Sequence, residues 1–258
     1  MSMKCKRNGR VAAVCAALVV CAIISAQVWG IDFLVPGIPL ESLSLRPGAR
    51  VSYLVTSRVF GVTDSSYVEL RVLGHAQGTS LLEILSSPYP RKKEGSLTVR
   101  FRLADRATSA KSAEEFRSCL GEIRVSEEGG TFRSPTQKEL DDIDIEGLFE
   151  RPSDHAERKA LGAARIATPS GTFLCEGAEL SRKATKQVSL GGVQAEREEE
   201  VTSRVWLSRD VPFWGLVRST VEKKSFTQTS LARSSTGSPR VTVTESILLS
   251  YRAPRGRS

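Results

Sequence analysis

The stretch that decides the fold is "TFLCEGAELSRKATKQVSLGGVQAEREEEVTSRVWLS", residues 172–208. Gly191 and Gly192 lie at its centre, and a glycine pair suits a two-residue turn with positive φ. We therefore predict one long β-hairpin in which Leu190 pairs with Val193. The opposed charges in that register are Lys183 with Glu200 and Glu179 with Arg204.

The same register sorts the apolar side chains of the hairpin. On one face it gathers Leu174, Ala178, Leu180, Val201, Val205 and Leu207. A slip of one residue would scatter them, because the side chains of a strand alternate between two faces. Trp206 falls on the other face, opposite Gly177, where an aromatic ring can cover a bare glycine.

Apolar and polar residues also alternate with a period of two elsewhere in the chain, both before and after a central region that lacks this pattern. This alternation predicts strands at residues 51–56, 68–73, 97–103 and 241–251. In the central region we expect helices at residues 109–120 and 134–149, with another helical turn or two at 153–162. The sequence therefore predicts a mainly β (α+β) fold. We expect a strongly curved antiparallel sheet, or half-barrel, of about eight to ten strands, with a few helices between the two strand groups covering its concave face.

The N-terminus predicts export. Four basic residues precede an apolar run, which makes residues 1–30 a signal peptide or, if uncleaved, a signal anchor with residues 11–31 in the inner membrane. Residues 31–47 are expected to be an extended linker, 48–251 a single half-barrel domain, and 252–258 a basic disordered tail. The predicted location is the bacterial periplasm or cell envelope.

Composition argues against several functions. The formal net charge is +8, but the basic residues outside the leader are spread along the chain, so we expect no nucleic-acid partner. The two histidines, His75 and His155, have no catalytic partners nearby in sequence, and no nucleophile motif is present, so no enzymatic activity and no cofactor are predicted. Residues 142–147 begin like a calcium loop, but Ser153 occupies the position that needs a bidentate glutamate, so no metal site is expected.

Three of the five cysteines lie in the leader, which leaves Cys119 and Cys175 in the exported domain. An oxidising compartment favours a disulfide between them. The alternative is two separate buried thiols, because sequence does not show whether they are close together.

The segment "SRDVPFWGLVRS", residues 208–219, links the hairpin to the next strand. Pro212 ends the strand ladder, so a corner is expected at one end of the sheet. Adjacent residues of an extended backbone point in opposite directions, so Phe213 or Trp214 should be partly exposed. We predict that these two rings and Trp206 form the rim of a ligand site; the alternative is a plug that closes the end of the core.

A basic triplet, Arg91, Lys92 and Lys93, follows "SSPYP". Such a group can contact anionic lipid headgroups. The alternative is an ordinary polar loop between two strands.

The order of elements, and the segment "RVWLSRDVPFWGLVR" with Trp206 and Pro212, resemble the periplasmic lipoprotein-carrier superfamily of LolA/LolB-like half-barrels. The resemblance implies an apolar concave surface that holds acyl chains or a lipidated partner. The expected function is thus an exported envelope protein that binds a lipid, an acyl chain or a lipidated partner in a curved-sheet groove. The alternative is a membrane-anchored structural or interaction protein of the envelope, which a filled core without ligand would favour.

Overall fold

The computed structural model describes residues 44–109, 113–137, 139–140, 157–190, 193–229 and 240–252. The expected leader, almost all of the linker, most of the second expected helix, His155 and the C-terminal tail lie outside these residues. Within them, no helix has the length and the apolar character needed to cross a membrane.

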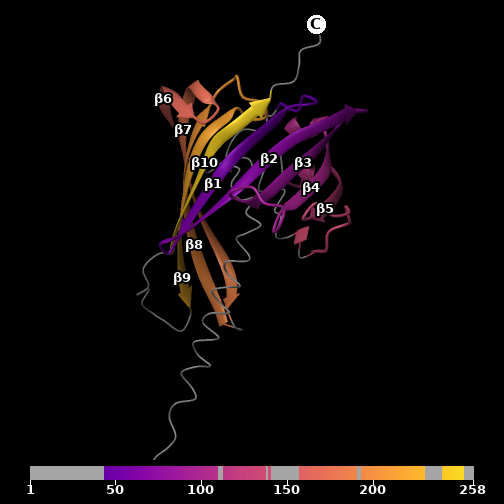
Figure 1. Ribbon diagram of the computed structural model, residues 1–258. Helices are drawn as coiled ribbons and strands as arrows, with labels where there is room; N and C mark the ends of the chain where they lie inside the picture. The colour runs from indigo at the N-terminus through magenta and orange to yellow at the C-terminus, as the bar shows by residue number, and fades with distance from the viewer. Residues whose placement is uncertain are drawn as a thin grey trace, which may run out of the picture.

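The described residues form ten strands in a single antiparallel sheet. They are β1 (Arg50–Val59), β2 (Val62–Ala76), β3 (Thr79–Pro88), β4 (Leu97–Ala104), β5 (Leu120–Glu127), β6 (Glu157–Thr168), β7 (Gly171–Leu190), β8 (Val193–Leu207), β9 (Leu216–Thr229) and β10 (Arg240–Arg252). Their order in the sheet is β5-β4-β3-β2-β1-β10-β9-β8-β7-β6, so β1 and β10 join the two strand groups (Figure 1). The predicted mainly antiparallel sheet is confirmed.

The sheet is curved but not closed. β5 and β6 are its two edges, and β8 and β9 extend below the other strands in Figure 1. The curvature brings β6 near β9 and β10, and it places the ring of Phe173 in β7 5.6 Å from that of Tyr251 in β10. Irregular pairing contributes to the bending, as at Ser52 and Tyr53 in β1, because a β-bulge increases local twist.

The hairpin of β7 and β8 has the predicted register. Leu190 pairs with Val193, although Gly191 and Gly192 themselves lie outside the described residues. The predicted ion pairs are Lys183 Nζ to Glu200 Oε1 at 3.3 Å and Arg204 Nε to Glu179 Oε2 at 2.6 Å. Trp206 covers Gly177 so closely that a Cβ added to the glycine would lie 2.5 Å from the ring, which confirms that prediction too.

The predicted apolar face of this hairpin is only partly correct. Ala178, Leu180, Val201 and Val205 are buried, but Leu174 is 68% exposed, while its neighbours Phe173 and Cys175 are buried. At this end of β7 the other face is covered, because Phe173 pairs with Ile166 of β6 and contacts Tyr251. The buried face therefore changes near Gly177, where strict alternation predicts no change.

The helices are short. The first region expected to be helical, residues 109–120, contains α2 (Ala113–Arg117), and a 3₁₀ turn, η2 (Asp105–Ser109), lies just before it. The two contribute Ala107 and Phe116 to the core. The helical turn expected at residues 153–162 is wrong from Glu157 onward, since β6 begins there. β6 is an edge strand paired only with β7, and most of its side chains are exposed, so it lacks the alternating pattern that identifies a half-buried strand.

Candidate functional site

The predicted rim at the turn between β8 and β9 is buried. Phe213 is 2% exposed and Trp214 5%, and both belong to the hydrophobic core, so the expectation of an exposed ring is wrong. Phe213 has a φ of +64°, which means that the backbone is not extended there. The two rings consequently do not diverge, and their centroids lie 6.1 Å apart. This corner plugs the end of the core.

Backbone hydrogen bonds hold the plug, residues 208–215, in place. The amide of Ser44 donates to the carbonyl of Phe213 at 3.0 Å, and the amide of Ser208 donates to that of Gly215 at 2.8 Å. Gly215 has a φ of +77°, and a Cβ there would lie 2.5 Å from the carbonyl oxygen of Ser208, so only glycine fits. Trp206, the third predicted rim residue, is partly buried over Gly177.

The concave face of the sheet is apolar, as predicted, but it is occupied by its own side chains. Tyr53, Phe101, Leu70, Ile84, Leu103 and Leu216 are among its largest fully buried residues. The hydroxyl of Tyr53 donates to the carbonyl of Leu216 at 3.1 Å, and burial raises the pKa of this phenol. The described residues thus give the concave face the character of a packed core.

The predicted disulfide is also wrong. Cys119 and Cys175 are free and buried, and their thiols donate to the carbonyls of Glu115 at 3.2 Å and of Phe173 at 3.6 Å. Cys119 immediately precedes β5, whereas Cys175 lies in β7, near the opposite edge of the sheet. Burial raises the pKa of Cys175, which disfavours the reactive thiolate.

The remaining candidates for chemistry are not brought together. His75 lies at the end of β2, where its Nε2 is 2.9 Å from Asp105 Oδ2 in an exposed pair. Across the parts of the chain that the structure describes, no cluster of three or more histidine, cysteine, aspartate or glutamate side chains could hold a metal ion.

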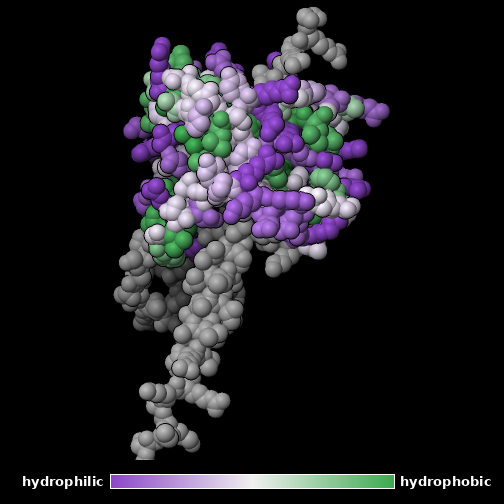
Figure 2. Space-filling view, in the orientation of Figure 1, coloured by the Kyte–Doolittle hydropathy of each residue, from purple (hydrophilic) through white to green (hydrophobic). Residues whose placement is uncertain are grey.

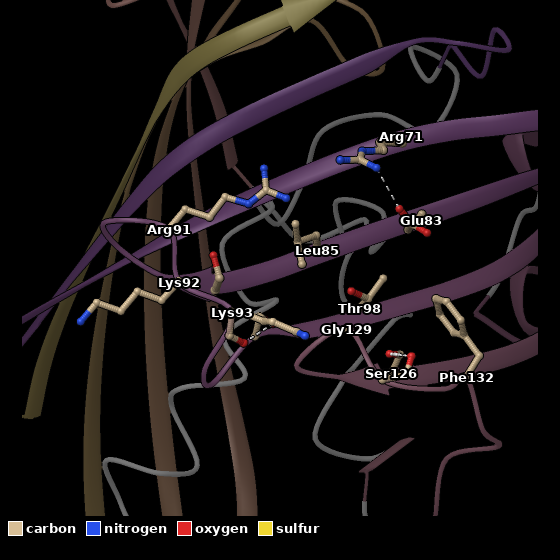
Figure 3. Close-up of a pocket in the computed structure, with 13 residues that line it drawn as sticks. Arg71, Glu83, Leu85, Arg91, Lys92, Lys93, Thr98, Ser126, Gly129 and Phe132 are labelled. Atoms are coloured by element: carbon tan, nitrogen blue, oxygen red, sulfur yellow. Dashed lines mark hydrogen bonds and ion pairs between the residues drawn. The ribbon is translucent and has the colours of Figure 1, made fainter.

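A polar pocket lies on the outer face of β2–β5, opposite the core (Figure 3). Its volume is about 470 Å³, and its lining is Arg71, Glu83, Leu85, Ser87, Arg91, Lys92, Lys93, Ser96, Thr98, Ser126, Gly129, Gly130 and Phe132. The strands supply the floor. The loop between β3 and β4 and the segment after β5 supply the walls.

A buried carboxylate anchors the sheet next to this pocket. Glu69 is fully buried and accepts hydrogen bonds from Arg50 Nη2 at 2.5 Å, from the hydroxyl of Tyr67 at 2.5 Å and from Arg71 Nε. Burial alone would raise the pKa of Glu69, but the bonds from Tyr67, Arg71 and Arg50 outweigh it and hold the pKa below its usual range. The network therefore fixes Arg71 at the pocket floor.

A second carboxylate orients the cations of the floor. Glu83 accepts from Arg100 Nη2 at 2.7 Å and from Arg71 Nη1 at 3.3 Å. The guanidinium of Arg100 lies 4.0 Å from the centre of the Phe132 ring, which joins the wall to the floor. Among the lining residues that the structure describes, Glu83 is the one carboxylate, and it is already paired.

The loop between β3 and β4 supplies cations that are less well compensated. Arg91 lies over the ring of Tyr67 at 5.1 Å, and its Nη1 is 3.9 Å from Glu69 Oε2. Neither Lys92 nor Lys93 forms an ion pair with any residue that the structure describes. The pocket is consequently cationic. The sequence pointed to this triplet, but it did not show that the loop closes over Arg71 and Ser87.

Comparison with known proteins reveals distant structural similarity only. No family model and no curated protein matches the chain. Solved structures that match include a protein from Bacteroides fragilis described as exported with a YmcC-like fold, at 10% identity, a TM-score of 0.33 and coverage of 86% of this chain and 99% of that one. A protein from Parabacteroides distasonis described as a lipoprotein matches at 10% identity and a TM-score of 0.34, over 82% of this chain and 98% of that one.

A LolA superfamily protein from Nitrosomonas europaea also matches, at 10% identity, a TM-score of 0.26 and coverage of 84% of this chain and 90% of that one. The weak resemblance to this superfamily, expected from the sequence, is therefore found among the matches. Because all three TM-scores are below 0.5, we base the function on the residues of this chain.

Proposed function

We propose that this chain is an exported protein of the cell envelope that binds the anionic group of a lipid or of a lipidated partner in the outer-face pocket. The observation that supports this most is the imbalance of charge among the described lining residues, which include four cations, Arg71, Arg91, Lys92 and Lys93, and one carboxylate, Glu83. Figure 3 shows Arg91 and Lys93 extending over the pocket, whereas Lys92 extends away from it. Export follows from the basic and apolar N-terminal segment of the sequence.

Electrostatics favour an anion at this place. Cations that converge on a recessed surface with low-dielectric walls concentrate the field and attract ligands of opposite charge. Glu69 and Glu83 are engaged with arginines, so they do not neutralise the loop lysines. An anion in the pocket would receive charge-assisted hydrogen bonds, which are about twice as strong as neutral ones.

An apolar patch at the same end of the sheet supports a lipid-bearing ligand. Phe60, in the turn between β1 and β2, is 76% exposed, and Val62, the first residue of β2, is 60% exposed. The Arg240 guanidinium lies 5.4 Å from the Phe60 ring centre. Figure 2 shows hydrophobic surface at the lower left, where Figure 1 places this turn. The pocket loop begins nearby, since the amide of Tyr89 donates to the carbonyl of Ser65 in β2.

The packed concave face favours a second candidate, a structural or interaction protein without a ligand. Tyr53 and Phe101 occupy the space in which a half-barrel carrier would hold an acyl chain, and Trp214 closes one end. An acyl-chain groove on this face would require the plug to leave the core.

Vesicle binding tests the proposal. Phosphatidylglycerol vesicles should sediment the protein, phosphatidylcholine vesicles should not, and 0.5 M salt should abolish binding because it screens charge. Removing two pocket charges in Arg91→Gln/Lys93→Gln should abolish binding. Arg102→Gln removes an exposed charge on the same face of β4 but outside the lining, and should have little effect. No binding to either kind of vesicle would favour the second candidate, and equal binding to both would contradict an anionic site.

A further inference from the structure

We propose that the anion taken by the pocket is a phosphate ester, held by Lys93 and Arg91 from the loop, by Arg71 from the floor and by the hydroxyl of Ser87. This inference rests on the proposed function for the charge of the ligand. It goes further in naming the chemical group, the residues that contact it and the nature of the rest of the ligand.

The first support is an unsatisfied hydroxyl. Ser87 lines the pocket and is 2% exposed, and its buried Oγ has no hydrogen-bond partner within the described part of the chain. The hydroxyls of two other lining serines are satisfied, since Ser96 donates to the carbonyl of Lys93 at 2.6 Å and Ser126 to that of Gly130 at 2.7 Å. Seven other buried side-chain atoms of the described residues also lack a partner, but Ser87 is the one among them that lines the pocket, so its hydroxyl is a donor that a ligand there could engage.

The second support is the direction of the cations. In Figure 3, Arg91 extends across the sheet towards Leu85 and Arg71, while Lys93 extends towards Gly129 on the other wall. Gly129 lies beside this lysine, since a Cβ on the glycine would be 3.4 Å from Lys93 Cε. The donors thus approach from the loop and from the floor.

This arrangement fits a tetrahedral anion better than a planar one. A carboxylate offers two oxygens in one plane and is matched by a free arginine fork. In Arg71, however, Nε is bound to Glu69 and Nη1 to Glu83, which leaves Arg91 as the one arginine of the described lining with an open fork. Separate point donors such as Lys93 and Ser87 can instead each contact a different oxygen of a phosphate, and lysine binds phosphate as a point charge.

The size and lining of the pocket describe the rest of the ligand. A volume of about 470 Å³ is in the range of small-molecule sites and exceeds what a single phosphate needs. Thr98 and Ser126 supply polar side chains, whereas Leu85 and Phe132 are the apolar ones in the lining. A phosphate that carries a sugar or a glycerol matches this surface, whether it is a soluble metabolite or a lipid headgroup.

Calorimetry with three sugars of similar size tests whether the anionic group of the ligand is a phosphate ester. Glucose 6-phosphate should bind with one site per chain, glucuronate should bind at least about tenfold more weakly, and glucose should not bind. Lys93→Gln and Arg91→Gln should each weaken glucose 6-phosphate about tenfold, the usual cost of losing a charged hydrogen bond. The control Arg102→Gln should leave the affinity unchanged.

Ser87→Ala separates a ligand contact from a structural role. It should weaken glucose 6-phosphate several-fold while leaving the melting temperature unchanged or higher, because it deletes a buried hydroxyl without a partner. An unchanged affinity would overturn the assignment of Ser87. Equal affinities for glucuronate and glucose 6-phosphate would overturn the phosphate inference and leave the anionic site of the proposed function standing.

The source of the phosphate is tested separately. If soluble glycerophosphoglycerol competes with glucose 6-phosphate for the pocket, the result supports a lipid headgroup that contains a phosphodiester as the ligand. Binding of the soluble esters without any binding to phosphatidylglycerol vesicles supports the phosphate site and contradicts the lipid part of the proposed function. No binding of any phosphate ester in either form, or an equal loss in Arg102→Gln, would overturn the inference.

Discussion

The two faces of β2–β5 differ sharply in their chemistry. On β2, Leu70 is buried in the core, while its neighbours Glu69 and Arg71 lie in a charged network on the opposite face. The inner face is filled by its own side chains. The outer face carries a pocket only because two loops rise beside it. The comparison teaches that the concave face, which was predicted to bind a ligand, is filled by the protein's own side chains. The recessed polar surface lies on the opposite, outer face of the same strands.

The largest effect should come from the plug. Trp214→Ala should lower the free energy of unfolding by about 3–5 kcal/mol, the usual cost of deleting a large buried aromatic side chain. The matched control is Phe60→Ala, an exposed ring, which should change stability by less than about 0.5 kcal/mol. Urea unfolding measures both. Similar small changes in the two variants would contradict the packed concave face.

The next largest effect concerns the outer face. Glu69→Gln should cost about 2–3 kcal/mol, because Arg50, Tyr67 and Arg71 lose a charged acceptor whose side chain is fully buried. The partners are partly exposed, which keeps the cost below that of a wholly buried pair.

The same carboxylate predicts a pH dependence. The pKa of Glu69 is lowered in the folded state, so its stabilisation is present above the ordinary value of 4.5 and is lost as the pH falls through the folded pKa. As the pH falls from 5 through the folded pKa of Glu69, the free energy of unfolding of the wild-type protein should therefore decrease more than that of the Glu69→Gln variant. Parallel losses in the two proteins would show that Glu69 is not the group responsible.

Much of the sheet was predictable because alternation and turn chemistry act locally. The register of β7 and β8 followed from a glycine pair and from the opposed charges Lys183 and Glu200. β6 could not be found in this way, since an exposed edge strand carries no alternation. The burial of both Phe213 and Trp214 depends on the left-handed backbone at Phe213, which an aromatic residue does not signal.

The pocket was predictable only in part. The triplet of Arg91, Lys92 and Lys93 is visible in the sequence as a cationic loop. Its position over Arg71 depends on the pairing of β2 with β3, and the second wall depends on where the chain turns after β5. These are contacts between distant segments, which local pattern does not encode.

A smaller effect is expected for the cysteines. Since both thiols are free and buried, a reducing agent should leave the melting temperature unchanged, and denatured, unreduced protein should label at Cys119 and Cys175. Cys175→Ala should cost about 1–2 kcal/mol, as for other small core truncations. If neither cysteine is labelled, the result would support the disulfide between Cys119 and Cys175 after all.

The smallest effect on folding should come from the turn between β1 and β2, where a change in binding is expected instead. Phe60→Ser replaces an exposed ring and should alter the free energy of unfolding by less than about 0.5 kcal/mol. If the ring enters a lipid surface, losing its burial weakens vesicle binding by about 1.5–3 kcal/mol, or roughly ten- to a hundredfold. Leu174→Ser, at an exposed leucine of β7, is the control and should leave vesicle binding unchanged. Glucose 6-phosphate should bind both variants like wild type. A Phe60→Ser variant that binds vesicles normally while Arg91→Gln/Lys93→Gln does not would place the whole contact in the pocket and leave the exposed ring without a part in it.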